Sequence, residues 1–304
     1  MNEDCKIKKE NIFVKLYRCV SPMIYNFIIT LLIQFPIGVL ISMIAIRQSF
    51  GDQDLYNEII DGIVMENSLL ILGVILVVTM PFMIMMKYFD RKKMVVWQEW
   101  KNFRLCNEKQ IVMVAILAIS FCIALNNLIA LSGIQELFTG YEEISEGIFI
   151  APIGLQIVVA GILAPIVEEF IFRGLIYRRI RYYMNIKWGI MISSLFFGVY
   201  HGNVVQCIYA TLMGVLMAYI YEKYHSILWP IIFHAIANIT AVCITSTDLG
   251  VYLHYNIISF FIVTIVTIML TIVSFNTIQK DAFQHKDEII GETNENNSTF
   301  NTIR

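Results

Sequence analysis

The sequence predicts an all-α protein, a polytopic membrane bundle of about eight transmembrane helices with both termini in the cytoplasm. Of its 304 residues, 58% are hydrophobic and 15% are charged, a balance that is typical of multi-pass membrane proteins rather than soluble domains. Apolar runs recur that are long enough to cross the ~30 Å hydrocarbon core of a bilayer. Basic residues gather in alternate connections between these runs, as the positive-inside rule expects.

The predicted spans lie at roughly 25–46, 68–86, 111–132, 150–176, 187–203, 204–221, 226–246 and 251–277. The fourth run is long enough to tilt or to continue past the membrane face. The fifth and sixth runs are short and meet in a tight turn near Gly202 and Asn203. They are therefore the weakest of the eight predictions.

The distribution of charge gives the orientation. Lys and Arg concentrate in the N-terminal segment, in the connections after the second and fourth spans, and after the sixth and eighth. The alternate connections hold Arg47 as their single basic residue and many acidic residues. Because basic connections stay in the cytoplasm, both termini are predicted on that side, in a multi-pass protein of the cell membrane.

This order divides the chain into five parts. They are a cytoplasmic N-terminal segment (1–24), three spans with a basic cytoplasmic loop (25–148), a core rich in membrane-embedded polar residues (149–246), a last span (247–278) and a polar tail (279–304). The composition of the tail predicts disorder. Within the basic loop, residues 94–105 mix aromatic and basic side chains, which predicts an amphipathic helix on the inner leaflet.

A charged cluster in the fourth span is the first candidate for a site. Glu168, Glu169 and Arg173 lie in an otherwise apolar run, although each charge in the membrane costs about a few kcal/mol. Glu169 and Arg173 are spaced i,i+4 and can form an ion pair. Glu168 points about 100° away around the helix, so we expect it to be free for chemistry. The alternative is a purely structural charge pair that fastens two helices.

Two later spans carry further polar residues. His201 follows Phe197 by one helical turn, and His234 and Asn238 share a helix face at i,i+4. From the predicted cytoplasmic edge, Glu168, His201 and His234 lie at depths of about 15, 21 and 14 Å, near the middle of the membrane. A lone His in a span is usually a helix-to-helix hydrogen-bonding residue, but this combination predicts an active site.

The residue types suggest hydrolysis. A carboxylate beside an imidazole can act as a general base on water, while His234 and Asn238 can donate hydrogen bonds to an oxyanion. Glu168, His201 and His234 could instead bind a catalytic zinc. The sequence has no H-E-x-x-H and no G-x-S-x-G, so other hydrolase designs match poorly.

The motifs Glu-Glu-x-x-x-Arg, Phe-x-x-x-His and His-x-x-x-Asn, in this order on successive spans, resemble those of the CPBP family. These are the CAAX-processing and bacteriocin-processing intramembrane proteases, also called Abi proteins, and the resemblance covers about residues 149–246. It implies an intramembrane endopeptidase in which Glu168 and His201 activate water and His234 and Asn238 form the oxyanion hole. Glu169, Arg173 and Phe197 would support the site.

The resemblance leaves the cofactor and the physiological role open. We favour a metal-free site over zinc, because Asn238 is a good oxyanion donor and a poor zinc ligand. The expected partners are the lipid bilayer and a membrane-associated peptide or protein substrate, with no nucleic acid, in bacteriocin or peptide processing or in self-immunity. The alternative is a non-catalytic immunity or scaffold protein of the same fold. A transporter is a third hypothesis, which the absence of visible internal repeats disfavours.

Overall fold

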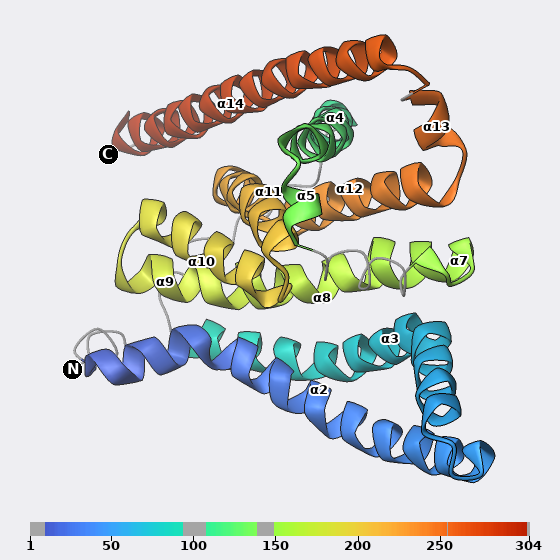
Figure 1. Cartoon of the computed structure of the whole chain (residues 1–304). Helices are drawn as coiled ribbons and strands as arrows, with labels where there is room; N and C mark the ends of the chain where they lie inside the picture. The colour runs from blue at the N-terminus through green and yellow to red at the C-terminus, as the bar shows by residue number, and fades with distance from the viewer. Residues whose placement is uncertain (1–9, 94–107, 139–148, 254, 303–304) are drawn as a thin grey trace.

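The computed structural model describes residues 10–93, 108–138, 149–253 and 255–302, without the side chains of 91–93, 136–137 and 281–302. These residues form helices and no strands, which confirms the predicted all-α membrane bundle (Figure 1). The amphipathic helix predicted at 94–105 lies outside the described residues.

In the described part of the chain, seven helices are long and apolar enough to cross a membrane. They are α2 (Ile12–Ser49), α3 (Gln53–Lys93), α4 (Glu108–Ser132), the continuous series from α7 to α9 (Ile153–Tyr183), α11 (Val204–Tyr224), α12 (Leu228–Ser246) and the first part of α14 (Ile257–Lys280). They correspond to seven of the eight predicted spans. The chain is therefore a multi-pass membrane protein.

The fifth predicted span is shorter than expected. It is α10 (Ile186–Tyr200), whose 15 residues extend about 22 Å and fall short of the ~30 Å hydrocarbon core. The helix ends because Gly202 adopts φ +70°, a conformation that favours glycine. The Asn203 side chain then accepts hydrogen bonds from Val205 N and Gln206 N and caps α11. Among the described residues, seven of the eight predicted spans thus have the length of a full span, and the remaining one is this shorter apolar helix.

Short helices complete the chain: α5 (Ile134–Leu137) after α4, and α13 (Leu249–Leu253) before α14. Helix α14 extends from Ile257 to Thr302, and these bounds differ from the disorder predicted for residues 279–304.

Helices α2 and α3 lie along one side of the series from α7 to α9, whereas α4 and α14 lie on the opposite side of the bundle, beyond α12 (Figure 1). Buried polar contacts join the N-terminal pair to the core. Asn26 of α2 donates to the Tyr200 hydroxyl of α10 at 2.8 Å and accepts from Thr79 of α3 at 3.2 Å. Arg179 of α9 forms a 2.7 Å ion pair with Asp90 of α3. Helices α2 and α3 are therefore fixed to the predicted core by specific contacts.

Candidate active site

The two glutamates lie on α8 (Ala164–Ile171), which is flanked by the π-helical segments η2 (Ile157–Leu163) and η3 (Phe172–Tyr177). Short π-helical segments occur frequently at functional sites. In η2, the Ala160 carbonyl accepts a 2.9 Å hydrogen bond from Asn238 Nδ2 of α12. A Cβ added to Gly161 would lie 2.9 Å from Ile239 Cγ1, so glycine permits the close approach of α12 at this level.

Glu169 and Arg173 form the ion pair that their spacing predicts. Arg173 Nη1 lies 2.8 Å from Glu169 Oε1, and both side chains are fully buried. Arg173 Nη2 donates to the Gly214 carbonyl of α11 at 3.0 Å, and its guanidinium lies 4.7 Å from the centre of the Phe197 ring of α10. Arg173 therefore neutralises Glu169 and links three helices beside the cavity.

Glu168 has a different environment. Its side chain is 14% exposed, whereas that of Glu169 is 0% exposed, and it lines a cavity of about 360 Å³. Its Oε2 faces His234 Nε2 at 3.7 Å, which is beyond hydrogen-bond distance. Its carboxylate is therefore accessible from the cavity, which is the geometry that a general base on water requires.

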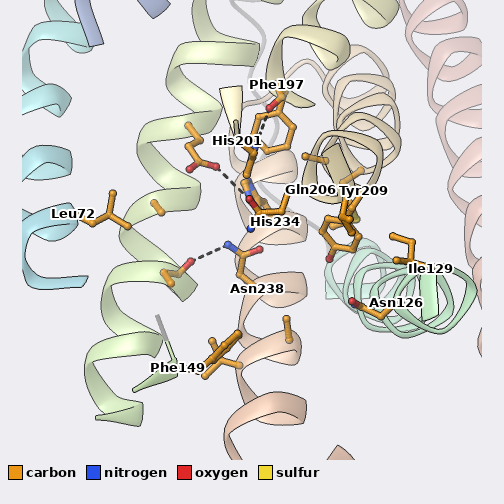
Figure 2. Close-up of a pocket in the computed structure, with 18 of the residues that line it drawn as sticks. Leu72, Asn126, Ile129, Phe149, Phe197, His201, Gln206, Tyr209, His234 and Asn238 are labelled. Atoms are coloured by element: carbon orange, nitrogen blue, oxygen red, sulfur yellow. Dashed lines mark hydrogen bonds and ion pairs between the residues drawn. The ribbon is translucent and has the colours of Figure 1, made fainter. Parts of the chain in front are cut away.

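His234 lies between the two carboxylates. Its Nδ1 is 3.0 Å from Glu169 Oε1, and because an ionised carboxylate only accepts hydrogen bonds, this nitrogen carries a proton. Its Nε2 faces Glu168 and the cavity. If the ring is protonated on both nitrogens, Nε2 also becomes a hydrogen-bond donor toward the cavity. Asn238, one turn further along α12, lines the same cavity (Figure 2).

His201 ends α10 and is held by its own helix. Its Nδ1 lies 2.8 Å from the Phe197 carbonyl. A carbonyl can only accept, so Nδ1 is the donor and Nε2 of the neutral ring is left as an acceptor. The buried Phe197 ring contacts both imidazoles, with centroids 4.9 Å from His201 and 5.5 Å from His234. Phe197 therefore keeps the two rings apart and oriented.

The structure thus brings Glu168 of α8, Phe197 and His201 of α10, and His234 and Asn238 of α12 together around one cavity. Figure 2 shows the last four of these side chains. Glu169 and Arg173 lie behind it. The placement agrees with the sequence analysis, while the catalytic roles stay a prediction.

The sequence analysis did not identify the rest of the cavity wall. Asn126 of α4, Gln135 of α5, and Gln206 and Tyr209 of α11 supply polar groups, and Leu72 of α3 lies on another side. The spacing of Gln206 and Tyr209 at i,i+3 placed them on one helix face, but it did not show which neighbour that face meets.

The same residues were tested for a zinc site. Among the residues that the structure describes, no three His, Cys, Asp or Glu side chains are grouped closely enough to hold a metal ion. In this arrangement Nδ1 of His201 is bonded to a carbonyl and Nδ1 of His234 to Glu169. Zinc-binding histidines usually donate their other ring N–H to a carbonyl or carboxylate, so these two hydrogen bonds are compatible with zinc as well as with a metal-free site. The absence of a metal stays a prediction.

Comparisons with known proteins point to the same segment. Residues 150–240 match the family model described as type II CAAX prenyl endopeptidase Rce1-like, and this segment includes all the candidate site residues. A protein of Bacillus subtilis (strain 168), named "Putative membrane peptidase YdiL", is 34% identical over 89 residues, which are 29% of this chain and 36% of that protein. The matched part of the chain thus spans about a third of the length of this curated relative. No solved structure matches. These findings confirm the resemblance to CPBP-type membrane proteases over this segment.

Proposed function

We propose that this membrane protein, whose residues 150–240 resemble the CPBP-type proteases, is an intramembrane endopeptidase acting on a membrane-associated peptide or protein. One observation carries the proposal. Of two adjacent glutamates, Glu169 is fully buried and paired with Arg173, whereas Glu168 faces a cavity that His201, His234 and Asn238 also line. A structural charge pair explains the first glutamate and leaves the second unexplained.

In this proposal, Glu168 takes a proton from a water molecule in the cavity while His201 Nε2 accepts the other hydrogen of that water and orients it. The water oxygen bonds to the carbonyl carbon, and the π electrons of the carbonyl move to its oxygen. In this step His234 is protonated on both ring nitrogens, so that its Nε2–H donates a hydrogen bond to this oxyanion together with the free N–H of Asn238. The C–N bond then breaks, and Glu168 returns the proton to the leaving amine.

The test is a comparison of peptide termini in membranes from cells that carry the wild type, Glu168→Gln or Glu66→Gln. Glu66 is exposed on α3 and does not line the cavity, so it is a matched control. We expect a set of new termini in the wild type and the control that disappears in Glu168→Gln. Identical termini in all three would favour the alternative, a non-catalytic immunity or scaffold protein.

We further propose that the reaction needs no metal. Purified protein should then contain no stoichiometric zinc and should keep its activity after prolonged chelation. One zinc per chain that is lost in His201→Ala and His234→Ala, but kept in Asn238→Ala, would instead establish a metalloprotease. The comparison works because an amide such as that of Asn238 is a poor zinc ligand.

A further inference from the structure

The cavity occupies one half of the bundle. Every helix that lines the cavity contributes residues from its middle or from the half that lies away from the basic connections. On α12, His234 lies within one turn of the helix midpoint. Examples are Asn126 and Ile129 of α4, Ala160 of the series from α7 to α9, Gln206 and Tyr209 of α11, and Ala241 of α12. Gln135 and Phe149, which border the connection between α5 and α7, complete this side.

The other half of the bundle is tightly packed beneath the site. Phe233, the neighbour of His234, is 0% exposed, and Trp229 one turn before it is 2% exposed. On the series from α7 to α9, the residues after Arg173 are buried in the same way, including Leu175 and Ile176. Large apolar side chains therefore close the site on the side of the basic connections.

The basic residues identify the two sides. The basic residues lie at the end of the tightly packed half of the bundle. They are Arg178, Arg179 and Arg181 at the end of the α7–α9 series, and Lys223 at the end of α11. By the positive-inside rule these ends are cytoplasmic. The cavity therefore extends toward the non-cytoplasmic face, where the acidic connections are predicted.

The chemistry of the wall indicates what the cavity accepts. Apart from the site residues, its polar groups are neutral: Asn126, Gln135, Gln206 and Tyr209, set among aliphatic and aromatic side chains. Amide and hydroxyl groups can bond the backbone of an extended peptide, and the apolar surface suits uncharged side chains. Among the lining residues that the structure describes, Glu168 alone is an acid, and none is Lys or Arg.

We propose that the substrate enters from the non-cytoplasmic face, as an extended and largely uncharged stretch of an exported peptide or of the outer part of a membrane protein. Cleavage of that stretch rests on the proposed function, but the direction of entry does not. A prenylated C-terminus presented from the cytoplasm would meet the packed half of the bundle.

Accessibility of single cysteines tests the direction. Cys5, Cys106, Cys207 and Cys243 are replaced by Ser, while the buried Cys19 and Cys122 are kept. Gln135→Cys and Gln206→Cys then report on the cavity wall from two helices, so that one misfolded variant leaves the other informative. Asp54→Cys and Lys187→Cys, both at exposed positions, mark the predicted outer and inner sides. Intact and permeabilised cells are treated with a membrane-impermeant maleimide.

We expect both cavity cysteines to react in intact cells together with Asp54→Cys, and Lys187→Cys to react only after permeabilisation. The proposal is overturned if the cavity cysteines react only after permeabilisation, if neither reacts while both markers do, or if the two markers are reversed. The labelling is repeated with Glu168→Gln. Because it needs no turnover, it separates the direction of entry from the question of proteolysis.

Discussion

Glu168 and Glu169 are neighbours in sequence, yet the same change to Gln should have different effects at the two positions. Glu169 is 0% exposed and is the ion-pair partner of Arg173, which is also 0% exposed. Gln at this position removes the charge and leaves the guanidinium buried beside a neutral amide. Loss of one partner of a buried ion pair costs on the order of 3–5 kcal/mol. Solvent does not reach the pair, so screening gives no reason to reduce this estimate.

Glu168→Gln should change stability by less than about 1 kcal/mol, because the side chain is partly exposed and contacts His234 only at 3.7 Å. It should nevertheless abolish cleavage, since an amide cannot accept the proton of water. Thermal unfolding of the purified proteins in detergent, together with their abundance in membranes, separates the two effects. Glu66→Gln serves as the neutral reference. Equal destabilisation by both substitutions, or none by Glu169→Gln, would refute this division of roles.

Three further predictions concern packing, the oxyanion and orientation. Gly198→Ala places a Cβ 2.5 Å from a backbone oxygen of α11, so the protein should lose about 1–3 kcal/mol of stability. Gly38→Ala, with no atom within 4 Å of the added Cβ, should cause no such loss. Thermal unfolding of both variants measures the difference, and equal midpoints would contradict the prediction. His234→Ala and Asn238→Ala should each lower the cleavage rate about 10²–10³-fold in assays of purified protein, and an unchanged rate for either would remove it from the oxyanion hole. Reporter fusions at positions 301 and 143 should report opposite sides of the membrane, and a common side would disprove the predicted topology.

The sequence was most informative about polar and charged residues that lie within predicted membrane spans. Charges and imidazoles in apolar runs are costly, so Glu168, Arg173, His201 and His234 stood out without a structure. Helical spacing then predicted the contact between Glu169 and Arg173, because i,i+4 neighbours on a helix have a fixed geometry. The shared depth of Glu168, His201 and His234 predicted that these three residues would converge.

Other features depend on packing and leave little trace in the sequence. The π-helical segments on either side of α8 have no composition signature, so the bond from Asn238 to the Ala160 carbonyl could not be predicted. Asn26 is one polar residue in an apolar span, and its partner Tyr200 is 174 residues away. The apolar run at 187–203 reads as a full span, although the turn at Gly202 ends α10 early. The position of the cavity in one half of the bundle became apparent only once its lining residues were known.

If Glu168 performs hydrolysis in this cavity, purified protein in lipid vesicles should show it without other cell components. The substrate is a peptide identified from the membrane comparison, and the rates are measured for wild type, Glu168→Gln and Glu66→Gln, with each variant shown to be folded by its thermal unfolding. We expect cleavage at a single site by the wild type and by Glu66→Gln, and none by folded Glu168→Gln. Cleavage at an unchanged rate by folded Glu168→Gln, or no cleavage by the purified wild type, would contradict it.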